Sequence, residues 1–459
     1  MSSGSPQGRL LGPRLVVAGT SSGAGKTTVA TGLMAAFRAR GMAVAPAKVG
    51  PDFIDPGYHE LATGRPGRNL DAWLSGPDLI APLAGRAAAG ADVLVVEGVM
   101  GLFDGAADGS LSSTADIAGL LDAPVVLVVD CSSQAASVAA LVHGFATFDP
   151  RVRLAGVILN RLGSDSHEQM VRDALAKAPS PVAVLGALHR DERLVWRDRH
   201  LGLVPVAERP DEVAAGLSAL ADLIAERCDL DELLDIAASA PALAVGKVPM
   251  PNVVGRARIA VAGGRAFTFS YRDNVEALEA AGAEIVAFDP LVDEALPPDV
   301  DALVVGGGFP EVMVEQLAAN QSLRSDVRAR IDEGLVVWAE CGGLLWLAAT
   351  LDGHSMVGAV AADGRMTERL TLGYRSAVQT VDTPLGPAGT ELRGHEFHYS
   401  TVEPSGSTLT LTGRTGTHVG GFGSPRLLAS YLHLHLGGRP DLAEAFVDAA
   451  VAARSGLSR

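Results

Sequence analysis

The chain has 459 residues, of which 48% are hydrophobic, and carries a formal net charge of −16. At roughly 100 to 200 residues per domain, this length predicts two to four domains with sizeable cores. The negative charge argues against nucleic acid as a partner, because contacts with a phosphate backbone need a basic surface. Apolar runs such as residues 123–130 fall well short of the roughly 18 residues that a membrane span needs. We therefore expect a soluble, cytoplasmic protein that binds neither nucleic acid nor membranes.

The N-terminus and the cysteines exclude further classes. Residues 1–13 lack the apolar core of a signal peptide, so we expect a flexible lead-in. Cys131, Cys228 and Cys341 lie far apart and form no Cys-x-x-Cys pair. This spacing argues against a disulfide framework and against a zinc site.

Residues 14–28 read RLVVAGTSSGAGKTT, an apolar run that leads into a glycine- and serine-rich loop. The pattern predicts a buried parallel strand, a phosphate-binding loop and a helix that begins near Lys26. Lys26 would neutralise the outer phosphates of ATP, and the Thr27 hydroxyl would lie within reach of Mg2+. The predicted nucleotide-binding residues of this loop are Gly23, Gly25, Lys26, Thr27 and Thr28.

The loop is a variant of the common phosphate-binding pattern. Five residues separate Gly19 from Gly25, whereas the common pattern has four, counted here from Thr20. The alternative is a glycine-rich strand-to-helix turn without a ligand. The preceding strand, the Gly-Lys-Thr-Thr run and the helix-forming sequence after it favour the nucleotide site.

Apolar runs alternate with helical stretches from residue 14 to about residue 206. This alternation predicts an α/β fold with a doubly wound parallel sheet, covered by helices on both faces. Ligands of such sheets bind at the carboxyl ends of the strands, so functional side chains are expected there. The expected strands are 14–18, 43–49, 92–97, 124–130, 154–159, 181–187 and 202–206.

Charged residues gather after the second expected strand. The segment 48–59 contains Lys48, Asp52, Asp55 and His59. Two carboxylates there could bind Mg2+ or orient a substrate, and we assign Asp52 to the metal and Lys48 to the nucleotide site. The alternative is that these are turn carboxylates that cap a helix.

Polar residues also end later strands. Glu97 stands at the tip of the third strand beside the phosphate-binding loop, where an acid is usually the second Mg2+ ligand. Asp104 follows it in a glycine-rich segment, and Asn160 ends the fifth strand, where its amide could read an adenine edge. Cys131 is expected to fill space in the core.

A second α/β domain is expected at 257–459, after a first domain at 14–236 and a linker at 237–256 that is rich in Ala, Pro and Gly. Its expected strands are 258–264, 283–288, 301–306 and 335–339. The glycine loop that begins at Gly306 lets backbone amides turn toward a ligand, and Gly307 is the predicted oxyanion site. Cys341 lies between an apolar strand and an apolar helix, which is the geometry of a nucleophile elbow.

A cysteine nucleophile needs a base, and four histidines are available: His395, His398, His433 and His435. If 433–435 is a strand, His433 and His435 share one face and either could be the base. A metal site at this His-x-His pair is disfavoured, because no carboxylate lies immediately beside it.

With both sites described, the chain resembles the cobyrinate or hydrogenobyrinate a,c-diamide synthase family over nearly its whole length. The resemblance implies a dethiobiotin-synthetase-like ATP domain joined to a class I glutamine amidotransferase domain. The motifs that carry it, in the family's order, are GTSSGAGKTT, KVGPDFIDPGYH, VVEGVMGLFDG, GGGFPE, AECGGLLWL, GHEFHYS and SYLHLHL.

The resemblance also implies roles for residues of the second domain. Cys341 looks like the glutaminase nucleophile, and His433 looks like its base because it follows Tyr431 and Leu432. The class often has a glutamate two residues after this histidine, but His435 stands there, which argues against CTP synthetase and leaves the acid unassigned.

In the first domain, the resemblance places Asp52, Phe53 and Ile54 at the site where the corrinoid carboxylate is bound and activated. Glu97 and Asp104 would lie beside Mg2+ and the reacting carboxylate. The family often has tyrosine and leucine where Phe53 and Ile54 stand, so a hydrogen-bonding hydroxyl is lost at residue 53.

The predicted function is therefore that of a glutamine-hydrolysing amide ligase. ATP would convert the a and c side-chain carboxylates of hydrogenobyrinate or cobyrinate to acyl phosphates, and ammonia released at Cys341 would form the amides. The expected ligands are Mg2+, ATP, L-glutamine and a corrinoid tetrapyrrole. Composition typical of a GC-rich genome favours the metal-free ring, and the oligomeric state is left open, with a homodimer as one alternative.

Three alternatives stay open at this point. The chain could amidate another tetrapyrrole, as cobyric acid synthase or nickel-sirohydrochlorin diamide synthase does. It could also be a P-loop switch ATPase whose second domain only binds a ligand. A dethiobiotin-type ligase is the third, but it leaves the second half of the chain unexplained.

Overall fold

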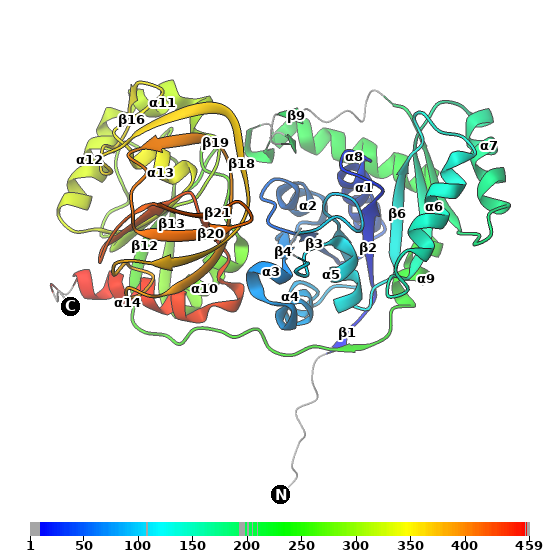
Figure 1. Cartoon of the computed structure of the whole chain (residues 1–459), viewed down its shortest axis with the longest axis horizontal. Coiled ribbons are helices and arrows are strands. Elements are labelled where there is room, and N and C mark those ends of the chain that lie inside the picture. The colour runs from blue at the N-terminus through cyan, green and yellow to red at the C-terminus, as the bar shows by residue number, and fades with distance from the viewer. Residues whose placement is uncertain are drawn as a thin grey trace, which may run out of the picture. The chain divides into compact units, whose positions relative to one another are not determined.

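The computed structural model of the chain describes residues 10–106, 109–191, 198–199, 202–203, 205–208, 210–454 and 456. The chain forms two compact units that divide between Val248 and Pro249 (Figure 1). This boundary falls inside the stretch 237–256 that the sequence suggests as a linker. Among the described helices, none combines the length and the apolar character needed to cross a membrane.

The first unit is built on a parallel sheet of seven strands in the order β4-β3-β5-β2-β6-β7-β8. Strands β2, β3 and β5 are buried along their whole length, as expected for a sheet with helices on both faces. The predicted doubly wound α/β fold is therefore confirmed. The strands are β2 (Arg14–Gly19), β3 (Val44–Val49), β4 (Arg68–Leu70), β5 (Val93–Glu97), β6 (Val125–Asp130), β7 (Leu154–Leu162) and β8 (Val184–His189).

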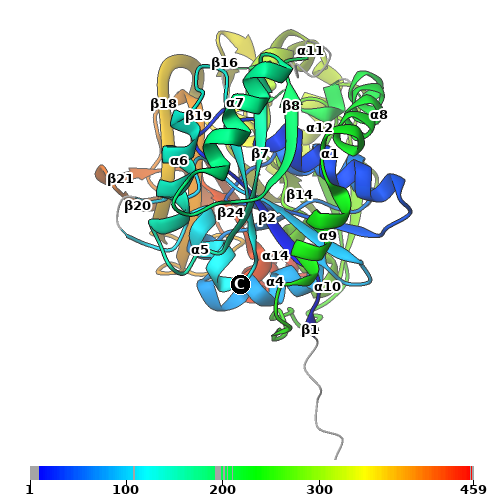
Figure 2. The same cartoon turned by 90° about the vertical axis from the view of Figure 1, so that its right-hand side faces the viewer.

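Helices flank this sheet in Figure 1 and bury apolar side chains from β2, β6 and β7 in one continuous core. Helices α6 (Ser137–Thr147) and α7 (Asp165–Ala176) lie side by side, as Figure 2 shows. The other helices of the unit are α1 (Lys26–Ala39), α2 (Asp55–Thr63), α3 (Ala72–Ser75), α4 (Ile80–Ala87), α5 (Thr114–Leu120), α8 (Pro210–Arg227) and α9 (Leu230–Ala238).

Two features of the first unit differ from expectation. The seventh strand of the sheet is β4 and not 202–206, because β10 (Gly202–Leu203) pairs antiparallel with β9 (Asp198–Arg199) in a separate sheet. The predicted flexible lead-in 1–13 is wrong for its last part, since β1 (Leu10–Leu11) pairs with β11 (Leu243–Ala244) and Leu11 is buried. Residues 1–9 lie outside the described residues.

The second unit contains a six-stranded sheet in the order β13-β12-β14-β15-β23-β22, parallel except for β22. Each strand expected between 258 and 339 is present in it. The strands are β12 (Ala257–Ala262), β13 (Ala283–Phe288), β14 (Ala302–Val305), β15 (Val336–Glu340), β22 (Phe422–Ser424) and β23 (Leu427–Ser430). Its helices are α10 (Arg272–Ala281), α11 (Val314–Ala319), α12 (Gln321–Asp332), α13 (Gly342–Leu347) and α14 (Pro440–Arg454).

A second sheet of this unit, with seven strands, was not predicted. Its long hairpin of β18 (Asp363–Gln379) and β19 (Glu391–Glu403) is antiparallel, and β19 also pairs with β24 (His433–Leu434). This pairing sets His433 opposite His395 and so brings two of the candidate histidines together. The remaining strands are β16 (Thr350–Leu351), β17 (His354–Ser355), β20 (Leu409–Gly413) and β21 (Gly416–Gly420).

Candidate functional site

The phosphate-binding loop connects β2 to α1. Gly23 and Gly25 have φ of 75° and 95°, a left-handed conformation that favours glycine. A methyl group on Gly25 would lie 2.2 Å from Nδ2 of Asn160, and one on Gly19 would lie 2.8 Å from Cγ of Lys26. Glycine is thus present at two points where the loop backbone closely approaches another side chain, and this accommodates the variant spacing.

Lys26 opens α1 and is buried under the loop, where its Nζ donates to the carbonyl oxygen of Ser21 at 3.0 Å. Burial, and then the nearby Lys48 ammonium, lower the pKa of Lys26 to about 8. A bound phosphate would supply the negative charge that this ammonium lacks in the free protein. We therefore expect the Lys26 amine to become fully protonated when a nucleotide binds.

A network of ionisable side chains surrounds the first turn of α1. The Thr27 hydroxyl donates to Oε1 of Glu97 at 2.6 Å, and Lys48 Nζ donates to the same oxygen at 2.9 Å. Lys48 also forms an ion pair of 2.7 Å with Asp55, and His59 Nε2 lies 2.6 Å from Oε2 of Glu97. Both oxygens of the buried Glu97 carboxylate are therefore engaged.

The electrostatics of this network follow from burial and ion pairing. Burial alone would raise the pKa of Glu97, but the Lys48 ammonium and the hydrogen bond from His59 hold it well below its usual value. Burial, followed by the neighbouring Asp52 charge, raises the pKa of Asp55 to about 8, against the opposing effect of Lys48. A divalent cation bound here would balance the excess negative charge of these carboxylates.

The structure corrects one metal assignment. Oδ1 of Asp52 accepts the backbone N–H groups of Ile54 and Asp55, so this carboxylate supports the start of α2. Asp55, three residues later, lies 3.3 Å from the Thr27 hydroxyl. Asp55, and not Asp52, is the carboxylate beside Thr27 and Glu97.

The oxygens of Thr27, Glu97 and Asp55 fit Mg2+, which commonly takes one or two carboxylates and completes its shell with phosphate oxygens and water. Within the described part of the chain, no group of three or more His, Cys, Asp or Glu side chains could hold a metal ion by itself.

The other predicted residues of the first unit lie around this network. Asp104 Oδ2 accepts the N–H of Gly101 at 2.9 Å, and Leu102 N–H donates to Gly19 O, so the 101–104 segment lies against the loop. Asn160 Nδ2 donates to Ala24 O at 2.9 Å and thereby supports the loop, while its adenine-reading role stays a prediction.

Phe53, Ile54 and Thr28 differ in exposure. Phe53 is half-buried, whereas Ile54 is buried at the start of α2. Of these two predicted substrate-binding residues, Phe53 therefore has more surface to offer a ligand. Thr28 is half-buried in the first turn of α1, next to Thr27.

In the second unit, Cys341 occupies the sharp turn between β15 and α13. Its φ of 49° is unusual for a residue with a side chain, as at other nucleophile elbows. A methyl group on Gly343 would lie 2.3 Å from the Val305 carbonyl oxygen, so the turn needs glycine there. The predicted elbow geometry is present.

The predicted oxyanion role of Gly307 needs correction. Its N–H donates to the carbonyl oxygen of Phe269 at 3.2 Å, and Phe269 N–H donates back at 3.0 Å. The next residue, Gly308, has its backbone nitrogen 3.1 Å from a methyl group placed on Gly342, beside the elbow. Gly308 is thus the better donor candidate, and Gly307 instead forms a wall against the His433 ring.

His433 is the histidine that contacts the nucleophile. Burial would lower its pKa, but hydrogen bonds with the Cys341 and Glu340 side chains raise it to about 10. Nδ1 of His433 lies 3.4 Å from Oε2 of Glu340, and the ring of His395 stacks on it at a centroid distance of 5.0 Å. Cys341 and His433 therefore form a close thiol–imidazole pair.

His435 has different surroundings. Its Nδ1 accepts the N–H of Gly437, its ring packs edge-on to Tyr271, and its Nε2 lies 3.8 Å from Oδ2 of Asp273. These contacts favour His433 as the base and leave His435 with a role in packing the chain after β24.

Sequence reasoning assigned no role to Glu340, His59 or Gly308. One signal for Glu340 is visible in the sequence: the run LVVWAE is apolar until its last residue, directly before Cys341. A carboxylate that ends a buried strand needs a partner. No comparable signal separates Gly308 from Gly307.

Comparison with known proteins agrees with this arrangement. Residues 15–203 match the CobQ/CobB/MinD/ParA nucleotide binding domain, and residues 258–441 match the CobB/CobQ-like glutamine amidotransferase domain. A hydrogenobyrinate a,c-diamide synthase of Streptomyces coelicolor is 50% identical, with 95% of this chain and 97% of the relative covered. One from Thermobifida fusca is 48% identical, with 95% and 96% covered.

A cobyrinate a,c-diamide synthase of Syntrophotalea carbinolica is 45% identical, with 95% of this chain and 98% of the relative covered. The matched stretches cover nearly the whole chain and therefore extend over both units. The chain belongs to the hydrogenobyrinate and cobyrinate a,c-diamide synthase family.

Proposed function

We propose that this protein uses ATP and glutamine to amidate the a and c side-chain carboxylates of hydrogenobyrinate. The observation that carries the proposal is that one chain holds both a phosphate-binding loop with Lys26, Thr27 and Glu97 and a Cys341–His433 pair. Family membership supports the diamide reaction. The relatives named for hydrogenobyrinate at 47–50% identity, against 41–45% for those named for cobyrinate, support the metal-free ring.

The first unit would activate the carboxylate, which does not react with ammonia as it stands. A carboxylate oxygen attacks the γ-phosphorus of ATP, the bond to ADP breaks, and an acyl phosphate forms. Lys26 and the loop amides stabilise charge on the transferring phosphoryl group. Thr27, Glu97 and Asp55 would hold Mg2+, which when bound neutralises phosphate charge.

The second unit would supply the nitrogen. His433, whose pKa is raised to about 10, holds the proton of the thiol–imidazole pair, and the Cys341 thiolate attacks the side-chain amide carbon of glutamine. The carbon–nitrogen bond breaks as His433 returns the proton to the leaving nitrogen, which gives ammonia and a thioester. Water then hydrolyses the thioester to glutamate. Ammonia attacks the acyl phosphate, phosphate leaves, and the amide forms with loss of a proton.

The ligands of the proposal are a corrinoid tetrapyrrole, L-glutamine, ATP and Mg2+. The homodimer considered from the sequence and the cytoplasmic location stay predictions.

The test is mass spectrometry of the products after incubation with ATP, Mg2+, glutamine and either hydrogenobyrinate or cobyrinate. We expect a diamide, formed faster from hydrogenobyrinate. A faster reaction with cobyrinate would overturn the choice of ring. Amidation of neither ring, with ATP hydrolysis intact, would instead favour the switch ATPase alternative.

A further inference from the structure

The position where this class of glutaminase often carries its acid is occupied here by His435. That side chain is buried and directed toward Tyr271 and Asp273. Oδ2 of Asp273 lies 3.8 Å from His435 Nε2, whereas the carboxylate beside the His433 ring is that of Glu340. The acid that supports His433 is therefore to be sought elsewhere than two residues after it.

We propose that Glu340, the residue directly before the nucleophile, is the positioning acid of His433 in the glutaminase reaction. Its Oε2 lies 3.4 Å from Nδ1 of His433, and its Oε1 accepts the N–H of Leu434 at 3.0 Å. The carboxylate thus contacts both the base and the backbone of the residue after it. This inference rests on the proposed glutaminase function.

The fold holds both partners of this contact in place. Glu340 is the last residue of β15, so it is fixed to Cys341 by one peptide bond and is 6% exposed. His433 is 1% exposed and is pinned between the stacked His395 ring and Gly307. At 3.4 Å the two atoms are in contact without a well-formed hydrogen bond, and catalytic contacts often tighten only when substrate binds.

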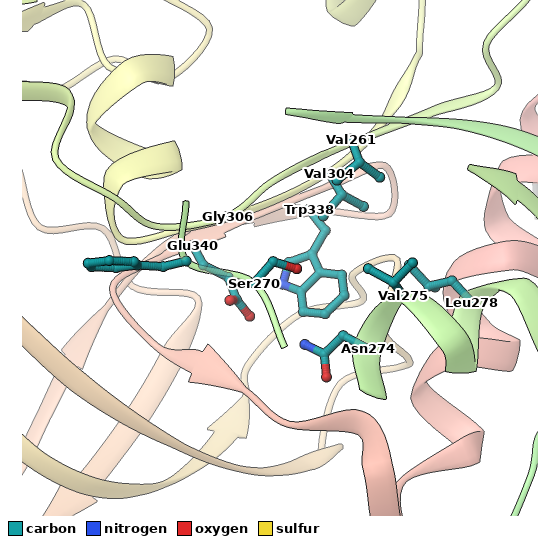
Figure 3. Close-up of a pocket in the computed structure, with 10 residues that line it drawn as sticks. Val261, Ser270, Asn274, Val275, Leu278, Val304, Gly306, Trp338 and Glu340 are labelled. Carbon is teal, nitrogen blue, oxygen red and sulfur yellow. The ribbon is translucent and has the colours of Figure 1, made fainter. Parts of the chain in front are cut away.

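Asn274 strengthens the same arrangement from α10. Its Nδ2 donates to Leu434 O at 2.8 Å, and its Oδ1 accepts the N–H of Leu436 at 2.7 Å. Glu340 and Asn274 therefore hold the segment 433–436 from two sides. Both also line a cavity of about 20 Å3, shown with Ser270 and Trp338 in Figure 3, which is room for about one water molecule beside the carboxylate.

The chemical role follows from the two nitrogens of the imidazole. With Nδ1 facing Glu340, Nε2 is left for the thiol of Cys341. With the proton of the pair on Nε2, the imidazolium is stabilised by the adjacent Glu340 carboxylate, which also keeps the ring oriented toward Cys341. Glu340 exchanges no proton with substrate and acts only through His433.

The experiment compares Glu340→Gln, Glu340→Asp and the matched control Asp273→Asn in the full-length enzyme. Asp273 is also a buried carboxylate beside a buried imidazole, but its partner is His435. We expect Glu340→Gln to lower glutaminase kcat by about 10²-fold with little change in KM for glutamine. Glu340→Asp should recover part of the loss, and Asp273→Asn should stay within about twofold of the unmodified enzyme.

A second readout reports on the ion pair directly. The pH dependence of Cys341 alkylation by iodoacetamide, followed on its peptide by mass spectrometry, measures thiolate formation. Burial raises the pKa of Cys131 to about 11 and that of Cys228 to about 12, so these thiols should not interfere near neutral pH. In Glu340→Gln the midpoint should move to higher pH, because the imidazolium loses its carboxylate.

Ammonia-driven synthesis should be unchanged in Glu340→Gln, which shows that the variant is folded. Unmodified glutaminase kinetics and an unmoved alkylation midpoint in this variant would overturn the role of Glu340. The same defects in Asp273→Asn but not in Glu340→Gln would transfer the role to Asp273. Absence of glutaminase activity in the unmodified enzyme would instead contradict the proposed function.

Discussion

Replacing Gly307 with alanine tests whether His433 must stand where the structure places it. A methyl group at this residue would lie 2.5 Å from Cε1 of His433 and 3.3 Å from Cβ of Phe269. Ordinary contact begins near 3.4 Å, so the imidazole has to move by about 1 Å. The ring also stacks on His395 and lies against Glu340, so a shift of this size should disturb its hydrogen bond to Cys341.

A misplacement of about 1 Å in a catalytic group lowers rates by about 10²-fold, or about 2.7 kcal/mol in the activation free energy. We therefore expect Gly307→Ala to lower glutaminase kcat by about that factor, measured as glutamate release. Synthesis from added ammonia should continue. Gly420→Ala is the matched control, because a methyl group there meets nothing closer than 3.6 Å. A Gly307→Ala enzyme with normal glutamine hydrolysis would refute the placement of His433 as the base.

Three further predictions concern the first unit. Since the pKa of Lys26 is lowered to about 8 by burial and by Lys48, calorimetric ATP affinity should weaken as pH rises through 8 and the ammonium loses its proton. Asp55, whose pKa is raised to about 8, loses its proton in the same pH range, and without Mg2+ its negative charge should weaken ATP binding further. The Lys26→Met variant should bind ATP weakly, and its affinity should depend less on pH. Lys48→Met leaves the Glu97 carboxylate buried without its cation and should destabilise the unit by about 3–5 kcal/mol at pH 7 in denaturant unfolding. That loss should shrink as pH falls and Glu97 becomes protonated. Asp104→Asn should impair amide synthesis from either nitrogen source, while glutamate release persists; loss of both activities would contradict a role confined to the first unit.

Local patterns in the sequence were sufficient for the parts of the site whose geometry is set by neighbouring residues. The loop before Lys26 and the elbow at Cys341 each consist of a buried strand, glycines and a helix start, and all three signals lie within one short stretch. The parallel strands were predictable for a similar reason, because burial on both faces produces continuous apolar runs. The three-residue strand β4 has no such run and was missed.

The partners that tertiary structure selects could not be predicted in this way. Asp52 and Asp55 are three residues apart, and only the start of α2 decides that the first accepts backbone N–H groups while the second faces Thr27. Glu340 meets His433 because β15 and β24 are brought together across two sheets. The backbone of Gly307 pairs with that of Phe269, so its N–H is not available for the expected oxyanion role, and no motif predicts this pairing.

The central claim is that glutamine is hydrolysed at Cys341 to feed an ATP-driven amidation carried out elsewhere on the same chain. The most direct measurement gives Cys341→Ala enzyme ATP, Mg2+ and hydrogenobyrinate, with either amide-15N glutamine or 15N-ammonium, and follows the diamide by mass spectrometry. The account predicts no labelled diamide from glutamine and normal labelled diamide from ammonium. Loss of product from both nitrogen sources, or labelled diamide from glutamine at the unmodified rate, would contradict it.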